Sequence, residues 1–175
     1  MQEAMQSKDS CSETFVNNAK ETIICFLDVH NFTPACERAS ASGAGGLLSF
    51  FNSFYSGVIP VLQEHKIEVN KLMGDGILAW AEKLKHAASG GIDALRWWKS
   101  TYKHFPKAFR DSKVKLMVFV VQLQAHRFRH GEVSHYLDYS WIGNELNIFF
   151  KSVKDDRFSR GPIQRIWFNR RAAQN

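Results

Sequence analysis

Hydrophobic residues recur along the chain in short continuous runs and at helical spacing. The apolar run 23–27 ends at an acid and predicts a buried strand, and the run 114–124 predicts another. Residues 67–73 and 77–82 flank a Gly-Asp-Gly turn, and Asp-Gly between two apolar runs is typical of a β-hairpin. Residues 129–141 indicate a turn and an edge strand, and residues 162–168 a closing strand.

The helical spacing is clearest in residues 47–65, whose apolar positions are Leu47, Leu48, Phe51, Phe54, Tyr55, Val58 and Leu62. We expect Pro60 to end or kink this helix. Residues 86–105 predict a second helix, whose start is left open by Gly90 and Gly91. Pro34 fits the first turn of a helix after the first strand, and residues 144–156 predict a last helix.

The expected order is therefore strand, helix, hairpin, helix, strand, strand, helix, strand. Helices that follow strands onto a largely antiparallel sheet give a two-layer α+β sandwich of ferredoxin-like type. A chain of 175 residues suits one domain. We expect a polar N-terminal segment over residues 1–20 and a compact domain over residues 21–175.

The composition is that of an ordinary globular protein, with 45% hydrophobic and 23% charged residues. No run approaches the roughly 18 apolar residues of a membrane span, so we expect no membrane association. The three cysteines cannot all pair, and Cys25 lies inside an apolar run. This pattern predicts reduced thiols and a cytoplasmic protein.

The net charge of +6 favours anionic partners, which include nucleoside triphosphates, nucleic acids and acidic lipids. No zinc-finger spacing and no aromatic-basic signature of an RNA-binding sheet is present, so we expect no nucleic acid partner. The histidines at 30, 126, 130 and 135 fit no standard zinc pattern.

Two acids stand where predicted strands end: Asp28 closes the first strand and Asp75 lies at the hairpin tip. If the hairpin pairs beside the first strand, both carboxylates converge at one end of the sheet. Such a pair suits Mg²⁺, which takes its remaining ligands from water and substrate phosphates. Gly74 and Gly76 beside Asp75 leave room for a triphosphate to approach the backbone, and the turn with Phe32 and Thr33 offers amide groups to phosphate oxygens. Taken alone, each acid is typical of an ordinary turn.

Three blocks, "FLDVHNFT", "NKLMGDGILA" and "DYSWIGNELNIFFK", occur in this order between residue 22 and about residue 151. Together they resemble the class III nucleotide cyclases, the adenylate and guanylate cyclase catalytic domain. The tail "SRGPIQRIWF" is similar to the closing segment of that family. The resemblance implies a phosphorus-oxygen lyase that converts a nucleoside triphosphate to a 3′,5′-cyclic nucleotide and pyrophosphate.

The resemblance also assigns roles to single residues. Asp28 and Asp75 match the two aspartates that hold two Mg²⁺ or Mn²⁺ ions, as in two-metal phosphoryl transfer. Asn147 matches the asparagine that orients the ribose, and Lys151 matches the arginine that stabilises developing phosphate charge. In the family the metal acids and the Asn/Arg pair come from different subunits, so the resemblance implies a homodimer with composite sites.

The base-selecting positions match Lys71 and Ser140, and Arg160 falls near a lysine that grips the triphosphate. Lys71 with Ser140 resembles the adenine-selecting pair and argues for ATP. Stand-alone members without regulatory parts include pyrimidine cyclases of bacterial anti-phage defence, and this analogy favours UTP or CTP slightly.

The chain also departs from the family pattern. Lysine at position 151 keeps the charge of arginine but loses its planar fork. The family's His-x-Gly strand is replaced by Gln122-Leu123-Gln124, and the segments around the asparagine helix are short. These departures motivate an alternative, a cyclase-like domain that binds nucleotides without turnover. A basic nucleic-acid-binding domain ranks third, since it rests on net charge alone.

Overall fold

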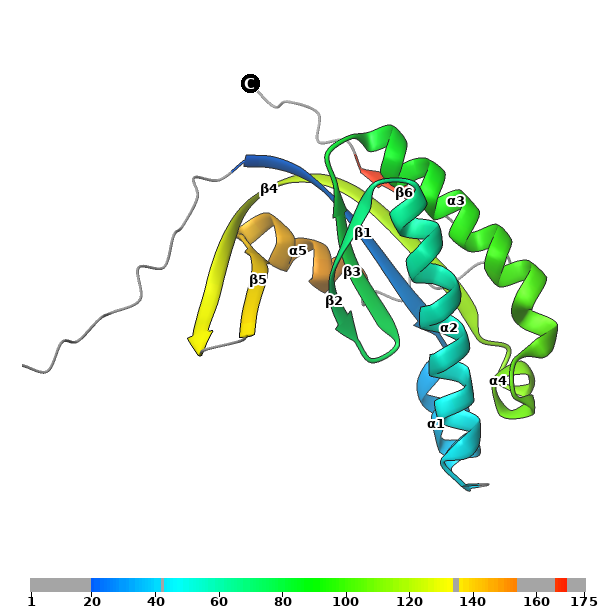
Figure 1. Cartoon of the computed structure of the whole chain (residues 1–175). Helices are drawn as coiled ribbons and strands as arrows, with labels where there is room; N and C mark the ends of the chain where they lie inside the picture. The colour runs from blue at the N-terminus through cyan, green and yellow to red at the C-terminus, as the bar shows by residue number, and fades with distance from the viewer. Residues whose placement is uncertain (1–19, 42, 134–135, 154–165, 170–175) are drawn as a thin grey trace, which may run out of the picture.

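The computed structural model describes residues 20–41, 43–133, 136–153 and 166–169 (Figure 1). The strands are β1 Lys20–His30, β2 Ile67–Met73, β3 Gly76–Ala81, β4 Lys115–Val133, β5 Tyr136–Ile142 and β6 Ile166–Asn169. The helices are α1 Phe32–Ala41, α2 Gly45–Glu64, α3 Leu84–Thr101, the 3₁₀ turn η1 Tyr102–His104, α4 Lys107–Asp111 and α5 Asn144–Val153.

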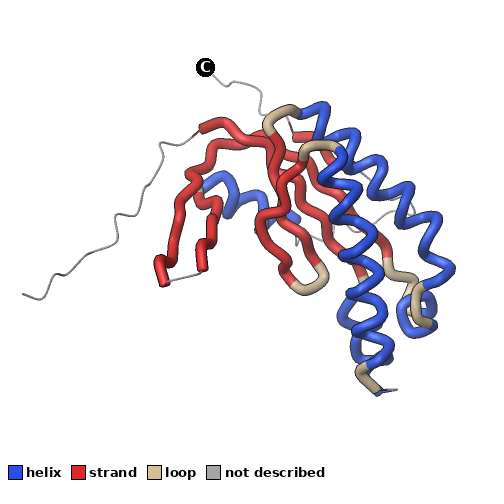
Figure 2. Tube along the Cα trace, in the orientation of Figure 1, coloured by secondary structure: helices blue, strands red, loops and turns tan. Residues whose placement is uncertain are grey.

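The sheet is largely antiparallel, as predicted from the sequence. Its strands follow the order β2-β3-β1-β4-β5, and β1 pairs antiparallel with both β3 and β4. The β2–β3 hairpin thus lies directly beside β1 (Figure 2). The first half of β4 also pairs parallel with β6, and its second half pairs with β5.

The two faces of the sheet have separate cores, because side chains alternate along each strand. On β1, Ile23, Cys25 and Leu27 join the core formed with α1 to α4, whereas Ile24 and Phe26 face the cluster that contains α5. Figure 1 shows α2 and α3 along one side of the sheet and α5 on the other. The α+β prediction is confirmed, and α5 adds a third layer to the two that were expected.

Helix α2 supplies the largest part of the first core. Its residues Phe50, Phe54, Val58 and Leu62 form a fully buried stripe. The helix does not end at Pro60 but continues to Glu64, because Pro60 is exposed while Val58 and Leu62 on either side are anchored. By length and composition alone α2 could cross a membrane, but its apolar stripe is used for packing on the sheet.

Several boundaries differ from the sequence prediction, and β1 continues past Asp28 to His30. Helix α3 begins at Leu84, ahead of the glycines, and a Cβ at Gly90 would lie 2.4 Å from Ile67 Cδ1. Gly90 therefore marks close packing rather than the helix start. Strand β4 continues to Val133 instead of turning near residue 129, because residues 126–130 pair with residues 138–142 of β5.

Candidate active site

The structure brings Asp28 and Asp75 together at one end of the sheet. Asp28 lies near the end of β1, directly opposite Gly76 at the start of β3. The backbone N–H of Val29 donates to the carbonyl oxygen of Asp75 over 3.2 Å. The hairpin register therefore places the two aspartates side by side, as the sequence predicted.

The two carboxyl groups sit in an environment that opposes their ionisation. Burial, followed by the negative charge of Asp75, raises the pKa of Asp28 from its ordinary 3.8 to about 6. Burial also raises the pKa of Asp75, against the opposing effect of a hydrogen bond from its own backbone amide. Two carboxylates held close together in partial burial form a site whose charge a bound cation would relieve.

The two glycines that flank Asp75 occupy their positions for different physical reasons. Gly74 has φ +71°, a conformation that side-chain-bearing residues rarely adopt, and an added Cβ would meet open space. At Gly76 a Cβ would lie 3.1 Å from the Phe26 ring and 3.3 Å from the Leu27 carbonyl oxygen. Glycine before Asp75 thus suits the backbone of the turn, and glycine after it avoids a tight contact with β1.

The turn that follows Asp28 leads directly into α1. Asn31 has φ 62°, and its side-chain amide donates to the Ser112 carbonyl at 3.4 Å. Phe32 begins α1 and anchors it through rings of the core, with centroids 5.5 Å from Phe51 and 5.7 Å from Phe50. Thr33 is exposed in the first turn, where backbone N–H groups have no helical acceptor.

Two further side chains lie close to Asp75, and the sequence pattern did not single them out. The Tyr55 hydroxyl on α2 donates to the carbonyl oxygen of Gly74. Burial, and then the charge of Asp75, raises the pKa of both Tyr55 and Cys36. Tyr55 belongs to the apolar stripe of α2, so the spacing indicated a core residue and gave no signal of its hydroxyl contact.

The residues matched to base selection lie on two different strands. Lys71 is exposed on β2, opposite Leu78 and just after a register shift between Val69 and Lys71. Ser140 is half-buried on β5, opposite Phe128 of β4. Lys71 thus shares the hairpin with Asp75, while Ser140 shares the β5–α5 unit with Asn147.

Asn147 and Lys151 are exposed one turn apart on α5. The opposite side of α5 packs on the sheet: Leu146 is buried, and Phe150 meets Phe26 edge-on with centroids 5.3 Å apart. The Glu145 carboxylate accepts a hydrogen bond of 2.7 Å from the backbone amide of Gln124 in β4. Helix α5 is therefore fixed to its own sheet, with its polar side turned outward.

Within the described part of the chain, neither Asn147 nor Lys151 forms a hydrogen bond or ion pair with Asp28 or Asp75. One copy of the chain therefore presents two separate groups, the acids at the hairpin and the amide and amine on α5. Arg160 lies outside the described residues.

Comparison with known proteins finds similar folds among solved structures. No family model and no curated protein matches the sequence. Among solved structures, a bacterial light-regulated adenylyl cyclase aligns with a TM-score of 0.71 at 18% identity, over 87% of this chain and 44% of its own. The adenylyl cyclase CyaB from P. aeruginosa gives 0.66 at 16% identity, over 87% and 78%. The guanylyl cyclase Cya2 gives 0.64 at 14% identity, over 78% and 70%.

The chain has the fold of a class III nucleotide cyclase domain. It spans less than half of the light-regulated enzyme. At these identities the likeness establishes the fold, which is the fold that the three sequence blocks implied. Asp28, near the end of β1, and Asp75, at the tip of the β2–β3 hairpin, both belong to the sequence blocks that resemble this family.

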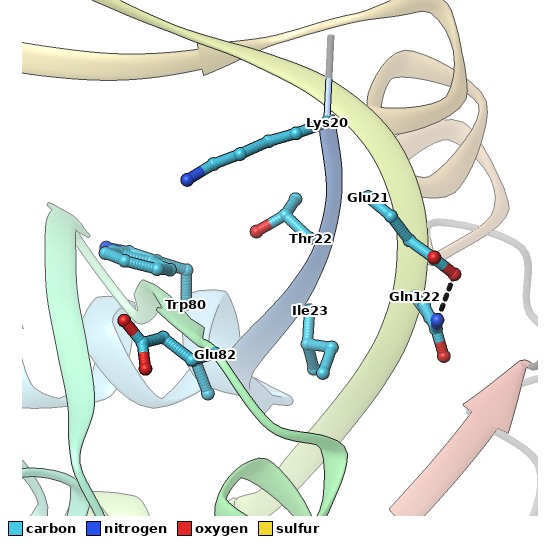
Figure 3. Close-up of a pocket in the computed structure, with 8 residues that line it drawn as sticks. Lys20, Glu21, Thr22, Ile23, Trp80, Glu82 and Gln122 are labelled. Carbon is cyan, nitrogen blue, oxygen red and sulfur yellow. Dashed lines mark hydrogen bonds between the residues drawn. The ribbon is translucent and has the colours of Figure 1, made fainter.

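A cavity at the other end of the sheet is separate from the acids. Its volume is about 270 Å³ (Figure 3), and it is lined by Lys20, Glu21, Thr22, Ile23, Trp80, Ala81, Glu82 and Gln122. None of the residues predicted for the site lines it. Lys20 lies over the rings of Trp80 and Trp141, 5.6 and 5.7 Å from their centroids. The cavity mixes an amine with carboxylates and indicates no single class of ligand.

Proposed function

We propose that this chain is a nucleotide cyclase domain that converts a nucleoside triphosphate to a 3′,5′-cyclic nucleotide and pyrophosphate. The observation that carries the proposal is the convergence of Asp28 and Asp75 at one end of a cyclase-type sheet. A structural role for the pair is disfavoured, because burial raises the pKa of both acids and the charge of Asp75 raises that of Asp28 further.

The donor set fits divalent cations such as Mg²⁺ or Mn²⁺. Two carboxylates supply hard oxygen ligands, and substrate phosphates and water complete the coordination of such ions. Among the described residues no group of three or more His, Cys, Asp or Glu side chains gathers at any place, so the protein ligands of the proposed site are these two carboxylates alone. When bound, the cations supply charge neutralisation at the phosphates and activation of the ribose hydroxyl.

The other residues would bind and orient the nucleotide. The first turn of α1, with Phe32 anchored in the core and Thr33 exposed, directs free backbone N–H groups toward phosphate oxygens. Asn147 would orient the ribose, and Lys151 would neutralise charge that develops on the phosphate. Because α5 is fixed to its own sheet with these two side chains outward, we propose that they act on the acids of a second copy.

The base is a finer part of the proposal. Lys71 and Ser140 stand on the hairpin and on β5 and would contact the base from two elements. The solved structures of similar fold are adenylyl and guanylyl cyclases, and the Lys-Ser pair favours ATP. We propose UTP or CTP as the substrate by analogy with the pyrimidine cyclases of bacterial anti-phage defence, with a role in anti-phage signalling.

The decisive experiment incubates the protein with ATP, GTP, CTP and UTP, each with Mg²⁺ or Mn²⁺, and identifies the products by mass spectrometry. We expect one cyclic nucleotide and pyrophosphate, and no product from the Asp75→Ala variant. Calorimetric nucleotide binding without a cyclic product would instead favour the second candidate, a binding domain without turnover, which the lysine at position 151 motivates.

A further inference from the structure

A contact between α2 and the hairpin tip fixes the backbone next to Asp75. The hydroxyl of Tyr55 donates a hydrogen bond to the carbonyl oxygen of Gly74, 19 residues further along the chain. Gly74 adopts φ +71° and immediately precedes Asp75. The orientation of this one carbonyl group is therefore coupled to the direction in which the Asp75 side chain leaves the turn.

The tip has few other restraints on its outer side. Leu72 and Met73 are 47% and 46% exposed, and an added Cβ at Gly74 would meet no atom within 4 Å. On the inner side, the N–H of Val29 holds the Asp75 carbonyl oxygen. The Tyr55 hydroxyl thus ties Gly74, the residue before Asp75, to helix α2. The hydrogen bond from Val29 ties Asp75 itself to strand β1.

The Tyr55 ring is well placed to serve as a fixed point. It stacks on Phe51 with centroids 5.6 Å apart and an interplanar angle of 12°, and it lies 5.4 Å from the Phe54 ring. Phe54 is completely buried in the main core. The hydroxyl therefore projects from a ring that the core holds in place, and little conformational freedom remains to be lost when a ligand binds.

We infer that Tyr55 is a positioning residue for Asp75: its hydroxyl holds the hairpin tip so that the carboxylate meets a divalent cation together with Asp28. This inference rests on the proposed function. Without the hydroxyl, the tip would sample more conformations, and cation binding would have to restrict them. Affinity for the cation would fall, although the fold and both carboxylates would remain.

The test compares Tyr55→Phe with Tyr102→Phe in the full chain. Tyr102 is a matched control, because its hydroxyl also donates to a backbone carbonyl, that of Arg110, at 3.1 Å, but joins η1 to α4 instead of holding the hairpin. Mn²⁺ binding without nucleotide is followed by electron paramagnetic resonance. Amide hydrogen exchange at Asp75 and Gly76 reports on the tip independently of any metal.

We expect Tyr55→Phe to bind Mn²⁺ about fivefold more weakly than wild type, which corresponds to the loss of one hydrogen bond, and to exchange faster at the tip. Tyr102→Phe should keep the wild-type affinity. Equal affinities in all three proteins, or equal losses in both variants, would overturn the inference. Failure of wild type to bind Mn²⁺ would overturn the proposed metal site, and unchanged exchange in Tyr55→Phe would then refute the hydroxyl contact itself.

Discussion

Replacement of Asp28 by asparagine should stabilise the metal-free protein while it removes a proposed metal ligand. In the folded chain, burial and the neighbouring Asp75 hold the pKa of Asp28 at about 6, against an ordinary value of 3.8. The folded state therefore holds this proton more tightly than the unfolded state does. The protonated Asp28 carboxyl group therefore contributes to the free energy of unfolding. This contribution is fully present below the ordinary pKa and is lost as the pH rises through about 6.

The size of the effect follows from the two pKa values. Their difference corresponds to at most about 3 kcal/mol, and the value is smaller if water reaches the partly buried carboxylate. Asparagine has nearly the same shape and does not ionise, so Asp28→Asn avoids this cost at neutral pH. For a chain of this length, each kcal/mol shifts the melting temperature by about 2–4 °C.

The assay is urea unfolding of wild type and Asp28→Asn at pH 4 and pH 7.5, in the presence of a chelator. The variant should be more stable at pH 7.5, and the two proteins should converge at pH 4. Asp93→Asn is a control of opposite sign, because hydrogen bonds from Arg96 and His65 lower the pKa of Asp93, so this variant should lose stability at neutral pH. An Asp28→Asn variant less stable than wild type at pH 7.5 would refute the reasoning.

Three other predictions test the site and the fold. Mixing inactive Asp75→Ala with inactive Asn147→Ala should restore part of the cyclase activity if sites are composite; no recovery in a product assay would contradict this. Lys151→Arg should raise turnover several-fold, because the planar fork binds phosphate in a bidentate manner, and an unchanged rate would show that the fork is not needed. Gly57→Ala should destabilise the fold by about 1–3 kcal/mol in urea unfolding, because the added Cβ would lie 2.0 Å from the Trp97 ring. An unaffected midpoint would contradict that packing.

Much of the fold could be predicted from the sequence, because its signals are local. The apolar run of β1 and the Asp-Gly turn predicted the strand and the hairpin, and the antiparallel pairing of β1 with β3 brings Asp28 and Asp75 together. The length of β4 was not predicted, since Gly131 within residues 129–133 resembles a turn, whereas pairing with β5 extends the strand. Long-range pairing overrides a local preference there.

The site was predictable only where a residue stands at an element boundary. Asp28 lies near the end of a strand and Asp75 in a turn, and the sequence blocks around them drew attention to both, although each acid taken alone is typical of an ordinary turn. Tyr55 stands in the middle of an apolar helix stripe, where spacing shows burial but not the direction of one hydroxyl group. The same limit applies to α5: the sequence predicted a helix there, but not that Leu146 and Phe150 pack on the face of the sheet opposite α2 and α3.

The packing of Gly76 affects what the Gly-Asp-Gly motif can tell us when it is found in a sequence. A Cβ at Gly76 would crowd the Phe26 ring, and Gly74 has a left-handed backbone, and neither constraint involves a nucleotide. A descendant of this chain that had lost catalysis would still be selected to keep both glycines for its stability. The two glycines of the Gly-Asp-Gly turn therefore report on the hairpin, and only the aspartate at its centre bears on the proposed activity.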